Sequence, residues 1–566
     1  MSLTLWYEGQ ARDLSARAPD GSFAGLARLL WLEGPLPPRP LCGGLGRCGR
    51  CRVRFLSTPP APAPSERRIL SAEDLEAGFR LACLHRAGDG MIIEVEPDPQ
   101  PGAQTKARAA PSPSSSPVPA SRAARKSKPG DSQPPRAGLH LAVDFGTTTV
   151  AWRAEDDSGA ILAAGESPNP QRAAGADVMS RLAEAATPDG TRRMSRLALE
   201  FLAGIVDGVA ENFGQVRDIC LAANPAMTAL ALGRDSSGLR AAPYRLDDGG
   251  NREEHVHSLP PLWIPPQLGP FVGGDISAGL ATVLDEERPF LLADMGTNGE
   301  FVLMPASGPS PDPSRHERPP LLAASVPLGP ALEGVGLRCG GPAGPGGVTA
   351  FHAGPQGLTA MTLNGDAPRH ICGTGYLSLI RLLLQLGLLD AGGGFCSGTP
   401  ASPGPLEFLR ARLAASLRPD SSPDSSGELV LPLPGGLFLS AGDVEAVLQV
   451  RAAFSLAVER LLAEAGLTPA RLQHIYLAGA LGRHAPLDAL EDLGFVPAGA
   501  AGRTLALGNT ALEGAALLLR GPGRNALRQR LSQSVAPCRV LDLVSDAGFH
   551  QDFIRHMRFG DTQRTV

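Results

Sequence analysis

The chain has 566 residues, a formal net charge of −5 and 43% hydrophobic residues, a length that predicts several structural units rather than one core. The acidic balance and the 5% aromatic content argue against a nucleic-acid-binding surface. The first residues, MSLTLWYEGQ, lack the apolar core of a secretory signal, and no uncharged apolar run reaches the roughly 18 residues of a membrane span. We therefore expect a cytoplasmic protein with neither nucleic acid nor membrane as a partner.

Lysine occurs at only three positions, Lys106, Lys126 and Lys128. All three lie in one Pro/Ser-rich segment, so the folded parts must use arginine wherever they need a cation. This argues against a Walker P-loop, a protein kinase and a Schiff-base enzyme, because each needs a lysine in its core.

Four N-terminal cysteines have the spacing of an iron–sulfur site: Cys42-x5-Cys48-x2-Cys51-x31-Cys83. Thiolates select iron–sulfur clusters or zinc. The glycines of CGGLGRCGRC allow a loop to wrap a cluster and point backbone N–H groups at its sulfides. Zinc is the alternative, but zinc sites usually pair two C-x2-C knuckles and only one is present. We therefore predict a [2Fe–2S] cluster.

Residues 1–97 are predicted to form a small β-rich domain, with strands at Val53–Phe55 and Met91–Val95 and a helix at Ser65–Leu75. Residues 98–138 are rich in proline and serine, lack apolar periodicity and are predicted to form a flexible linker.

From Leu139 the pattern becomes α/β. A strand at Leu139–Asp144, a turn at Gly146–Thr148 and a strand at Thr149–Arg153 are followed by the same arrangement at Phe290–Asp294, Gly296–Gly299 and Glu300–Met304. The repetition predicts a duplicated fold, with lobes at 139–285 and 286–566. A helix is predicted after Ser440, where Asp443 completes a capping box, and it is predicted to end at Gly466.

Each Asp-x-Gly-Thr turn carries the groups of a phosphate-binding loop. A carboxylate holds Mg²⁺, a glycine permits close backbone approach, and hydroxyl and N–H groups bind phosphate. The predicted nucleotide residues are Asp144, Gly146, Thr147 and Thr148 in the first loop and Asp294, Gly296, Thr297 and Asn298 in the second.

Two further segments complete the candidate nucleotide site. The strand and turn at Ile475–Gly482 predict an adenosine contact through Gly479 and Gly482, although an ordinary strand-to-helix turn fits equally well. Asp275 follows a Gly-Gly pair and opens a helix. It is a candidate for orienting the attacking water or the metal, and a helix cap is the equally weighted alternative.

The whole chain resembles the reductive activators of corrinoid proteins, which join a ferredoxin to an ASKHA ATPase. The resemblance covers about residues 40–515 and rests on the cysteine loop, both Asp-Gly-Thr turns and several further stretches. These stretches are NPQRAAGADVMSRL (169–182), APYRL (242–246), FVGGDISAGLAT (271–282), PLGPALEGVG (327–336), ICGTGYLSLI (371–380) and GNTALEGA (508–515).

The resemblance implies a β-grasp [2Fe–2S] domain followed by duplicated RNase-H-like lobes of the actin, Hsp70 and sugar-kinase type. It implies that Cys42, Cys48, Cys51 and Cys83 hold the cluster and that the chain binds ATP and Mg²⁺. It also implies ATP-dependent transfer of one electron from the cluster to the Co(II) of a methyltransferase's corrinoid protein, giving Co(I). The implied partners are that corrinoid protein, a cellular electron donor and a second copy of the chain.

Three other functions stay open on the sequence. The chain is alternatively an ATP-driven activator of a different low-potential or radical enzyme, or a nucleotide-binding redox sensor. A sugar kinase with an appended ferredoxin is the third, although no convincing general base for a polyol is found.

Overall fold

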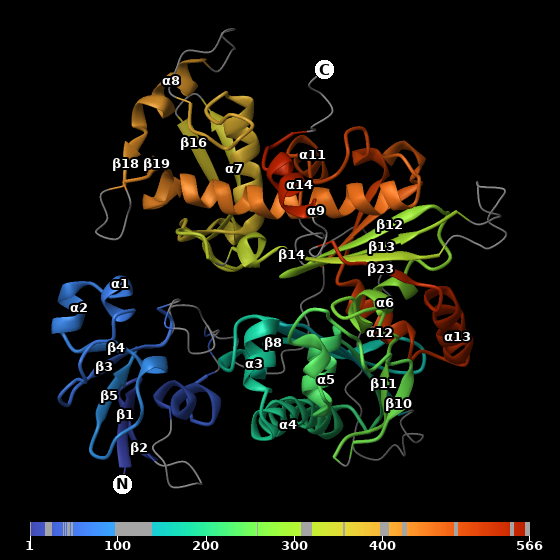
Figure 1. Ribbon diagram of the computed structural model, residues 1–566, viewed down its shortest axis with the longest axis horizontal. Helices are drawn as coiled ribbons and strands as arrows, with labels where there is room; N and C mark the ends of the chain where they lie inside the picture. Colours follow the sequence, from blue (N-terminus) through green and yellow to red (C-terminus); the bar gives the residue numbers. More distant parts are fainter. Residues whose placement is uncertain are drawn as a thin grey trace, which may run out of the picture. The chain divides into compact units, whose positions relative to one another are not determined.

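The computed structural model describes residues 2–16, 25–37, 39, 41, 46, 49–96, 138–256, 258–306, 320–334, 336–354, 357–396, 407–420, 427–479, 485–543 and 548–560. The chain divides into two compact units (Figure 1): Met1–Ala278 with Ala511–Gln529, and Gly279–Thr510 with Arg530–Val566. The predicted linker lies outside the described residues except for Gly138. No helix among these residues is both long and apolar enough to cross a membrane.

The first unit begins with a five-stranded sheet of order β2-β1-β5-β3-β4, drawn in blue in Figure 1. In β1, Leu3 and Leu5 are fully buried while Ser2 and Trp6 are exposed, the alternation expected of a half-buried strand. β1 runs parallel to β5, and the other neighbours are antiparallel. The elements are β1 (Ser2–Tyr7), β2 (Gln10–Ser15), η1 (Arg28–Leu32), β3 (Arg52–Phe55), α1 (Glu66–Ile69), α2 (Ala72–Glu76), β4 (Phe79–Leu81), η2 (Ala82–Leu84) and β5 (Ile92–Val95).

The single helix predicted over Ser65–Leu75 is two short helices, α1 and α2. Leu70 has an extended backbone between them. The Ser71 hydroxyl then accepts a hydrogen bond from the Asp74 N–H at 3.0 Å and caps the second helix. A serine cap in the middle of a helical pattern therefore starts a new helix instead of continuing the old one.

The first unit also contains a six-stranded sheet of order β10-β11-β9-β6-β7-β8. The predicted first hairpin is confirmed, with β6 antiparallel to β7 and parallel to β9. β6 is buried along nearly its whole length, as in a strand covered on both faces. The elements are β6 (Leu139–Phe145), β7 (Thr149–Glu155), β8 (Ile161–Pro168), η3 (Pro170–Ala173), α3 (Val178–Glu184), α4 (Pro188–Asn212), β9 (Val216–Ala222), α5 (Pro225–Leu232), η4 (Ser237–Leu239), β10 (Arg252–Glu254), β11 (Leu262–Ile264) and α6 (Gly274–Ala281).

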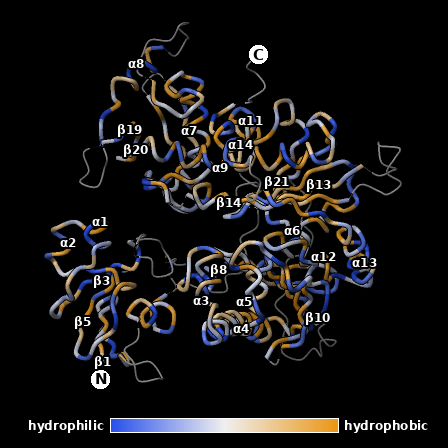
Figure 2. The backbone as a smooth tube through the Cα atoms, in the orientation of Figure 1, coloured by the Kyte–Doolittle hydropathy of each residue, from blue (hydrophilic) through white to orange (hydrophobic). Residues whose placement is uncertain are grey.

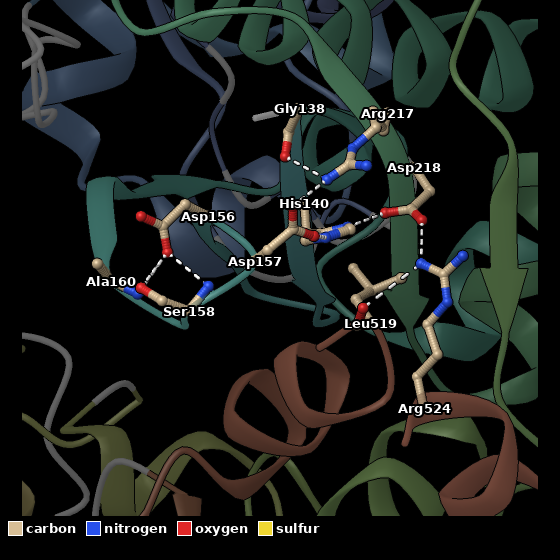
Figure 3. Close-up of polar contacts among 10 residues, drawn as sticks. All are labelled: Gly138, His140, Asp156, Asp157, Ser158, Ala160, Arg217, Asp218, Leu519 and Arg524. Carbon is tan, nitrogen blue, oxygen red and sulfur yellow. Dashed lines mark hydrogen bonds and ion pairs between the residues drawn. The ribbon is translucent and has the colours of Figure 1, made fainter. Parts of the chain in front are cut away.

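A polar network around the buried His140 ties the start of β6 to a segment from near the C-terminus (Figure 3). His140 Nδ1 lies 2.5 Å from Asp218 Oδ1, and its Nε2 lies 2.9 Å from Asp157 Oδ1. Arg524 Nη1 donates to the other Asp218 oxygen at 2.6 Å, and Arg217 donates to Asp157 at 2.5 Å. Arg524 lies 306 positions after Asp218 in the chain, so this contact helps to hold residues 511–529 in the first unit.

The His140–Asp218 contact shifts both titrations. The hydrogen bond that His140 donates to Asp218 raises the pKa of His140, since the carboxylate favours the imidazolium. Burial opposes ionisation of Asp218, but the hydrogen bonds from His140 and Arg524 prevail and lower its pKa. The pair is therefore a charge-assisted contact at neutral to mildly acidic pH.

The second unit contains a six-stranded sheet of order β22-β21-β12-β13-β14-β23. The predicted second hairpin is confirmed as β12 and β13, and β21 runs parallel to β12. Figure 2 shows the strands around β13 as largely hydrophobic, in keeping with the burial of Phe301, Val302 and Leu303. The elements are β12 (Phe290–Met295), β13 (Asn298–Met304), β14 (Leu322–Pro327), η5 (Pro330–Glu333), β21 (His474–Ala478), α11 (Leu487–Asp492), η9 (Ala501–Arg503), β22 (Thr504–Gly508), β23 (Arg539–Leu541) and α14 (Phe549–His556).

Two helices near the C-terminus carry the segment that returns to the first unit. They are α12 (Thr510–Leu517) and α13 (Arg524–Val535). Residues 511–529 belong to the first unit, and the rest of α13 belongs to the second.

The helix predicted after Ser440 is confirmed as α9, the long orange helix of Figure 1. Both hydrogen bonds of the predicted capping box are present between Ser440 and Asp443, and Gly466 follows the C-cap with φ at 64°. Two small sheets, β16-β15-β17 and β18-β19-β20, complete the second unit. The elements are β15 (Gly347–Gly354), β16 (Gly357–Thr362), η6 (Leu363–Gly365), β17 (His370–Ile371), α7 (Gly373–Gln385), α8 (Glu407–Ser416), β18 (Arg418–Pro419), β19 (Leu429–Pro432), η7 (Pro434–Gly436), β20 (Phe438–Ser440), α9 (Ala441–Glu464) and η8 (Pro469–Arg471).

Candidate functional site

The first phosphate loop joins β6 to β7 in the first unit. Asp144 lies near the end of β6 and pairs with Ala222 of β9. A Cβ on Gly146 would lie 2.6 Å from the Thr149 carbonyl oxygen, so the turn needs a glycine there. The Thr147 side chain is buried, and Asn224 Nδ2 lies 3.4 Å from its hydroxyl. The predicted residues therefore occur together on one hairpin.

Asn224 was not predicted as a site residue. It lies just after β9 and caps α5, its side chain accepting a hydrogen bond from the Met227 N–H at 2.9 Å. A cap that also reaches the Thr147 hydroxyl connects α5 directly to the phosphate loop.

Asp275 lies in the first turn of α6, and its Oδ1 accepts a hydrogen bond from the Ile276 N–H at 2.9 Å. The preceding glycines pack against the end of β9: Gly274 N–H donates to the Ala223 carbonyl at 2.9 Å. A Cβ on Gly273 would lie 2.4 Å from the Asn224 Cα. The Gly-Gly turn therefore brings Asp275 to the β9 end that also presents Asn224, and its role as cap or as catalytic group stays a prediction.

The second phosphate loop joins β12 to β13 in the second unit. Asp294 pairs with Ala478 of β21, and Gly479 follows directly with φ at +88°. A Cβ on Gly479 would lie 2.8 Å from Asp294 Oδ1, so only glycine permits this approach. The turn predicted to contact adenosine therefore lies beside the second loop; Gly482, the other predicted residue of that turn, lies outside the described residues. The remaining predicted loop residues are placed as follows: Gly296 and Thr297 lie in the turn, and Asn298 is the first residue of β13.

Glu333 is a second residue that sequence reasoning missed. Thr297 Oγ1 donates to Glu333 Oε1 at 2.8 Å, and the Leu328 and Gly329 N–H groups donate to the Thr297 carbonyl. Burial raises the pKa of Glu333, although the hydrogen bond from Thr297 offsets part of the effect. The stretch PLGPALEGVG, which contains Glu333, therefore supports the second phosphate loop.

Two of the four predicted cluster ligands, Cys42 and Cys48, lie outside the described residues. Of the other two, Cys51 is buried and Cys83 is half-buried. The hydrogen bond between the two thiols lowers the pKa of Cys83 to about 7, and the Gly46 N–H contributes in the same direction. Within the described residues no group of three or more His, Cys, Asp and Glu side chains is arranged to hold a metal ion.

The residues that are described fit a cluster-binding loop. Gly46 and Gly49 both have positive φ, at 63° and 68°, and a Cβ on Gly46 would lie 2.9 Å from the Leu84 side chain. A thiolate-bound cluster needs small residues with a left-handed backbone around it. It also needs sulfur atoms that accept hydrogen bonds from backbone N–H groups.

The fold and its matching sequence models define the class of the protein. The chain is a mixed α/β protein in which residues 288–566 match the C-terminal domain of RACo, the ASKHA domain, and residues 139–286 match the RACo middle region. The chain belongs to this family, the reductive activators of corrinoid proteins.

Two similar proteins agree with this placement. The chain is 26% identical over 434 residues to the corrinoid activation enzyme RamQ of Eubacterium limosum, covering 74% of this chain and 70% of the relative. A solved structure described as a reductive activator for corrinoid, iron-sulfur protein shares the fold, with a TM-score of 0.62, 20% identity and 99% coverage of both chains. A 65-residue stretch, 12% of this chain and 15% of the relative, is 31% identical to one component of the Na⁺-translocating NADH-quinone reductase of Chlamydia caviae.

Proposed function

We propose that the protein uses ATP to reduce the Co(II) of a corrinoid protein to Co(I), the state that accepts a methyl group. One electron comes from a cellular low-potential donor, and ATP is hydrolysed to ADP and phosphate. The observation that carries the proposal is that one chain of this family holds a thiolate-stabilising cysteine pair and two Asp-Gly-Thr hairpins.

The proposal assigns the architecture as follows. Residues 1–97 form a β-grasp ferredoxin-like domain, 98–138 a linker, and 139–285 and 286–566 the two lobes of a duplicated RNase-H-like fold. The duplication is supported by the two six-stranded sheets, in which an antiparallel three-stranded meander is extended by two further parallel strands in the same spatial order. The protein acts in the cytoplasm as a homodimer.

Cys42, Cys48, Cys51 and Cys83 would hold a [2Fe–2S] cluster, which supplies one-electron chemistry when bound. The Gly46 N–H stabilises negative charge at the Cys83 sulfur, and the burial of Cys51 restricts access of water. The backbone N–H therefore favours the more negative state of this site, and burial opposes it.

The two phosphate loops would bind Mg²⁺-ATP. Asp144 and Asp294 hold the metal ion, directly or through water. Thr147, Thr148, Thr297 and Asn298 donate to phosphate, Thr297 through its backbone N–H because its hydroxyl donates to Glu333. Gly146 and Gly296 allow close approach of the phosphate, and Gly479 and Gly482 pass beneath the adenosine. Asp275 orients the attacking water.

The energy that ATP must supply is modest. For a one-electron transfer, about 59 mV corresponds to about 1.4 kcal/mol, so an uphill gap of roughly 100–200 mV costs about 2–5 kcal/mol. A nucleotide-driven change that binds one redox state of the corrinoid protein more tightly covers such a gap.

The proposal is tested with purified, cluster-loaded protein and a Co(II) corrinoid protein. We expect a slow ATPase that the Co(II) form stimulates and the Co(I) form does not, and we expect Asp144→Asn and Asp294→Asn to abolish it. An ATPase that ignores the corrinoid protein but responds to another low-potential enzyme would support the alternative activator, and a nucleotide response without any electron transfer would support the sensor.

A further inference from the structure

A fully buried arginine lies directly behind the first phosphate loop. Arg181, on α3, is 0% exposed, and each of its donor nitrogens has an acceptor. Nη2 donates to the Thr147 carbonyl at 2.5 Å, Nε to the Gly175 carbonyl at 2.9 Å, and Nη1 to the Met227 sulfur at 3.2 Å. In the described part of the chain no carboxylate oxygen lies within ion-pair distance of this guanidinium.

The segment that carries Arg181 donates hydrogen bonds to three successive carbonyl oxygens of the phosphate loop. Asn169 Nδ2 donates to the Gly146 carbonyl at 2.7 Å, Arg181 donates to the Thr147 carbonyl, and Asn169 N–H donates to the Thr148 carbonyl at 3.0 Å. In a trans peptide the C=O and N–H groups point in opposite directions. Donors on the carbonyl side therefore polarise the loop peptides and strengthen their N–H groups as donors to phosphate.

The same segment also contacts the segment that leads into the predicted cluster loop. Ala176 N–H donates to the Leu41 carbonyl at 2.6 Å, and Leu41 N–H donates to the Arg172 carbonyl at 3.4 Å. The Gly175 carbonyl that accepts from Arg181 and the Ala176 N–H belong to one peptide group. Leu41 immediately precedes Cys42, a predicted ligand, in the sequence. Arg181 is thus one peptide group away from Leu41 and in direct contact with Thr147.

We propose that Arg181 is a positioning residue that relays nucleotide binding at the first phosphate loop to the cluster-bearing segment at Leu41. This inference rests on the proposed function, since it assumes that the loop binds nucleotide. Phosphate drawn to the loop N–H groups shifts the Thr147 carbonyl, and the rigid guanidinium passes the shift to the Gly175–Ala176 peptide and so to Leu41.

The chemistry of the site requires arginine for this relay. A guanidinium is planar and offers donors in fixed, divergent directions, so it holds Thr147 and Gly175 at once. Lysine keeps the charge but lacks this fork. Burial lowers the pKa of Arg181 to about 9, so the charge persists at neutral pH.

The test is hydrogen exchange in the full-length protein with and without the ATP analogue AMPPNP and Mg²⁺. In the wild type we expect AMPPNP to slow exchange of the Leu41 and Ala176 amides. In Arg181→Lys we expect AMPPNP affinity to fall about tenfold or more, through loss of a charge-assisted hydrogen bond, and the slowing to be lost even at saturating AMPPNP. Arg196→Lys, an exposed position on α4, is the matched control and should behave like the wild type.

The relay is overturned if AMPPNP binds the wild type without slowing exchange at Leu41 and Ala176, or if Arg181→Lys keeps the slowing. If Arg181→Lys fails to fold, the wild-type result decides alone. No corrinoid protein is used, so a failed relay leaves ATP-dependent cobalt reduction intact. A wild-type protein that does not bind AMPPNP would instead contradict the proposed function.

Discussion

Replacing His140 tests whether the polar network at the start of β6 stabilises the first unit through charge. His140→Leu removes both contacts of a nearly fully buried imidazole. The contact with Asp218 is charge-assisted and worth about 1.5–3 kcal/mol, whereas the half-exposed Asp157 contact is screened and counts for little. Asp218 keeps its Arg524 partner at 2.6 Å, so no uncompensated charge is left. We therefore expect a loss of about 2–3 kcal/mol in the free energy of unfolding at pH 6.

The pH dependence gives a second, sharper signature. The folded pKa of His140 is raised, so its charged contact stabilises fully below its ordinary pKa of about 6.5 and is lost as pH rises through the folded pKa. Asp218 has a lowered pKa, so its contribution to the free energy of unfolding is present above about pH 4 and is lost as the pH falls through its folded pKa. The network therefore stabilises most between about pH 4 and 6.5. A neutral histidine still donates one hydrogen bond, so the cost of His140→Leu should fall to about 1 kcal/mol at pH 9.

Urea unfolding followed by tryptophan fluorescence measures this directly, because all four tryptophans, Trp6, Trp31, Trp152 and Trp263, lie in the first unit. His140→Gln keeps a donor but cannot titrate and should flatten the profile between pH 6 and 9, while Asp157→Asn should change stability little. Parallel profiles for the wild type and His140→Gln, or a cost of His140→Leu that does not vary with pH, would refute the reasoning.

Three other predictions follow from the candidate site. Glu333→Gln should stabilise the second unit by about 1–3 kcal/mol at pH 8, because ionising a buried carboxylate with a raised pKa destabilises the folded state as pH rises above the ordinary pKa of glutamate. Calorimetry should show that this gain vanishes near pH 4, and a gain that persists there would contradict the prediction. Asn224→Ala should lose a cap worth about 1 kcal/mol and weaken ATP binding severalfold by titration calorimetry. Thr187→Ala, an equivalent cap on α4, should cost similar stability and leave ATP binding unchanged; equal loss of affinity in both would argue against a role for Asn224 at the loop. Cys83→Ser should lose the visible absorption and iron content of the reconstituted cluster, whereas Cys396→Ser should keep both.

Local sequence patterns predicted the hairpins and the capped helix well. The strands β6 and β12 were predicted to within one residue at their ends. A strand–glycine–strand pattern depends on residues that are neighbours in the sequence, so it can be recognised without knowing the tertiary contacts. The capping box at Ser440 was predicted for the same reason. The split between α1 and α2 was missed because Ser71 was not weighed as a cap.

Contacts between distant residues could not be predicted in the same way. Nothing local to Arg181 or Glu333 shows that one contacts the Thr147 carbonyl and the other the Thr297 hydroxyl. Both residues lie in stretches that match the family pattern, 169–182 and 327–336, and that match was the available signal. The return of residues 511–529 to the first unit likewise depends on long-range pairs such as Arg524–Asp218.

The measurement that tests the central claim most directly is anaerobic absorption spectroscopy of a Co(II) corrinoid protein mixed with this protein and a low-potential electron donor. We predict that the Co(I) band appears only when ATP, Mg²⁺ and the cluster-loaded protein are all present, and that Cys83→Ser and Asp294→Asn each abolish it. Co(I) formation at the same rate without ATP, or none at all with a reducible cluster and bound ATP, would contradict the proposed function.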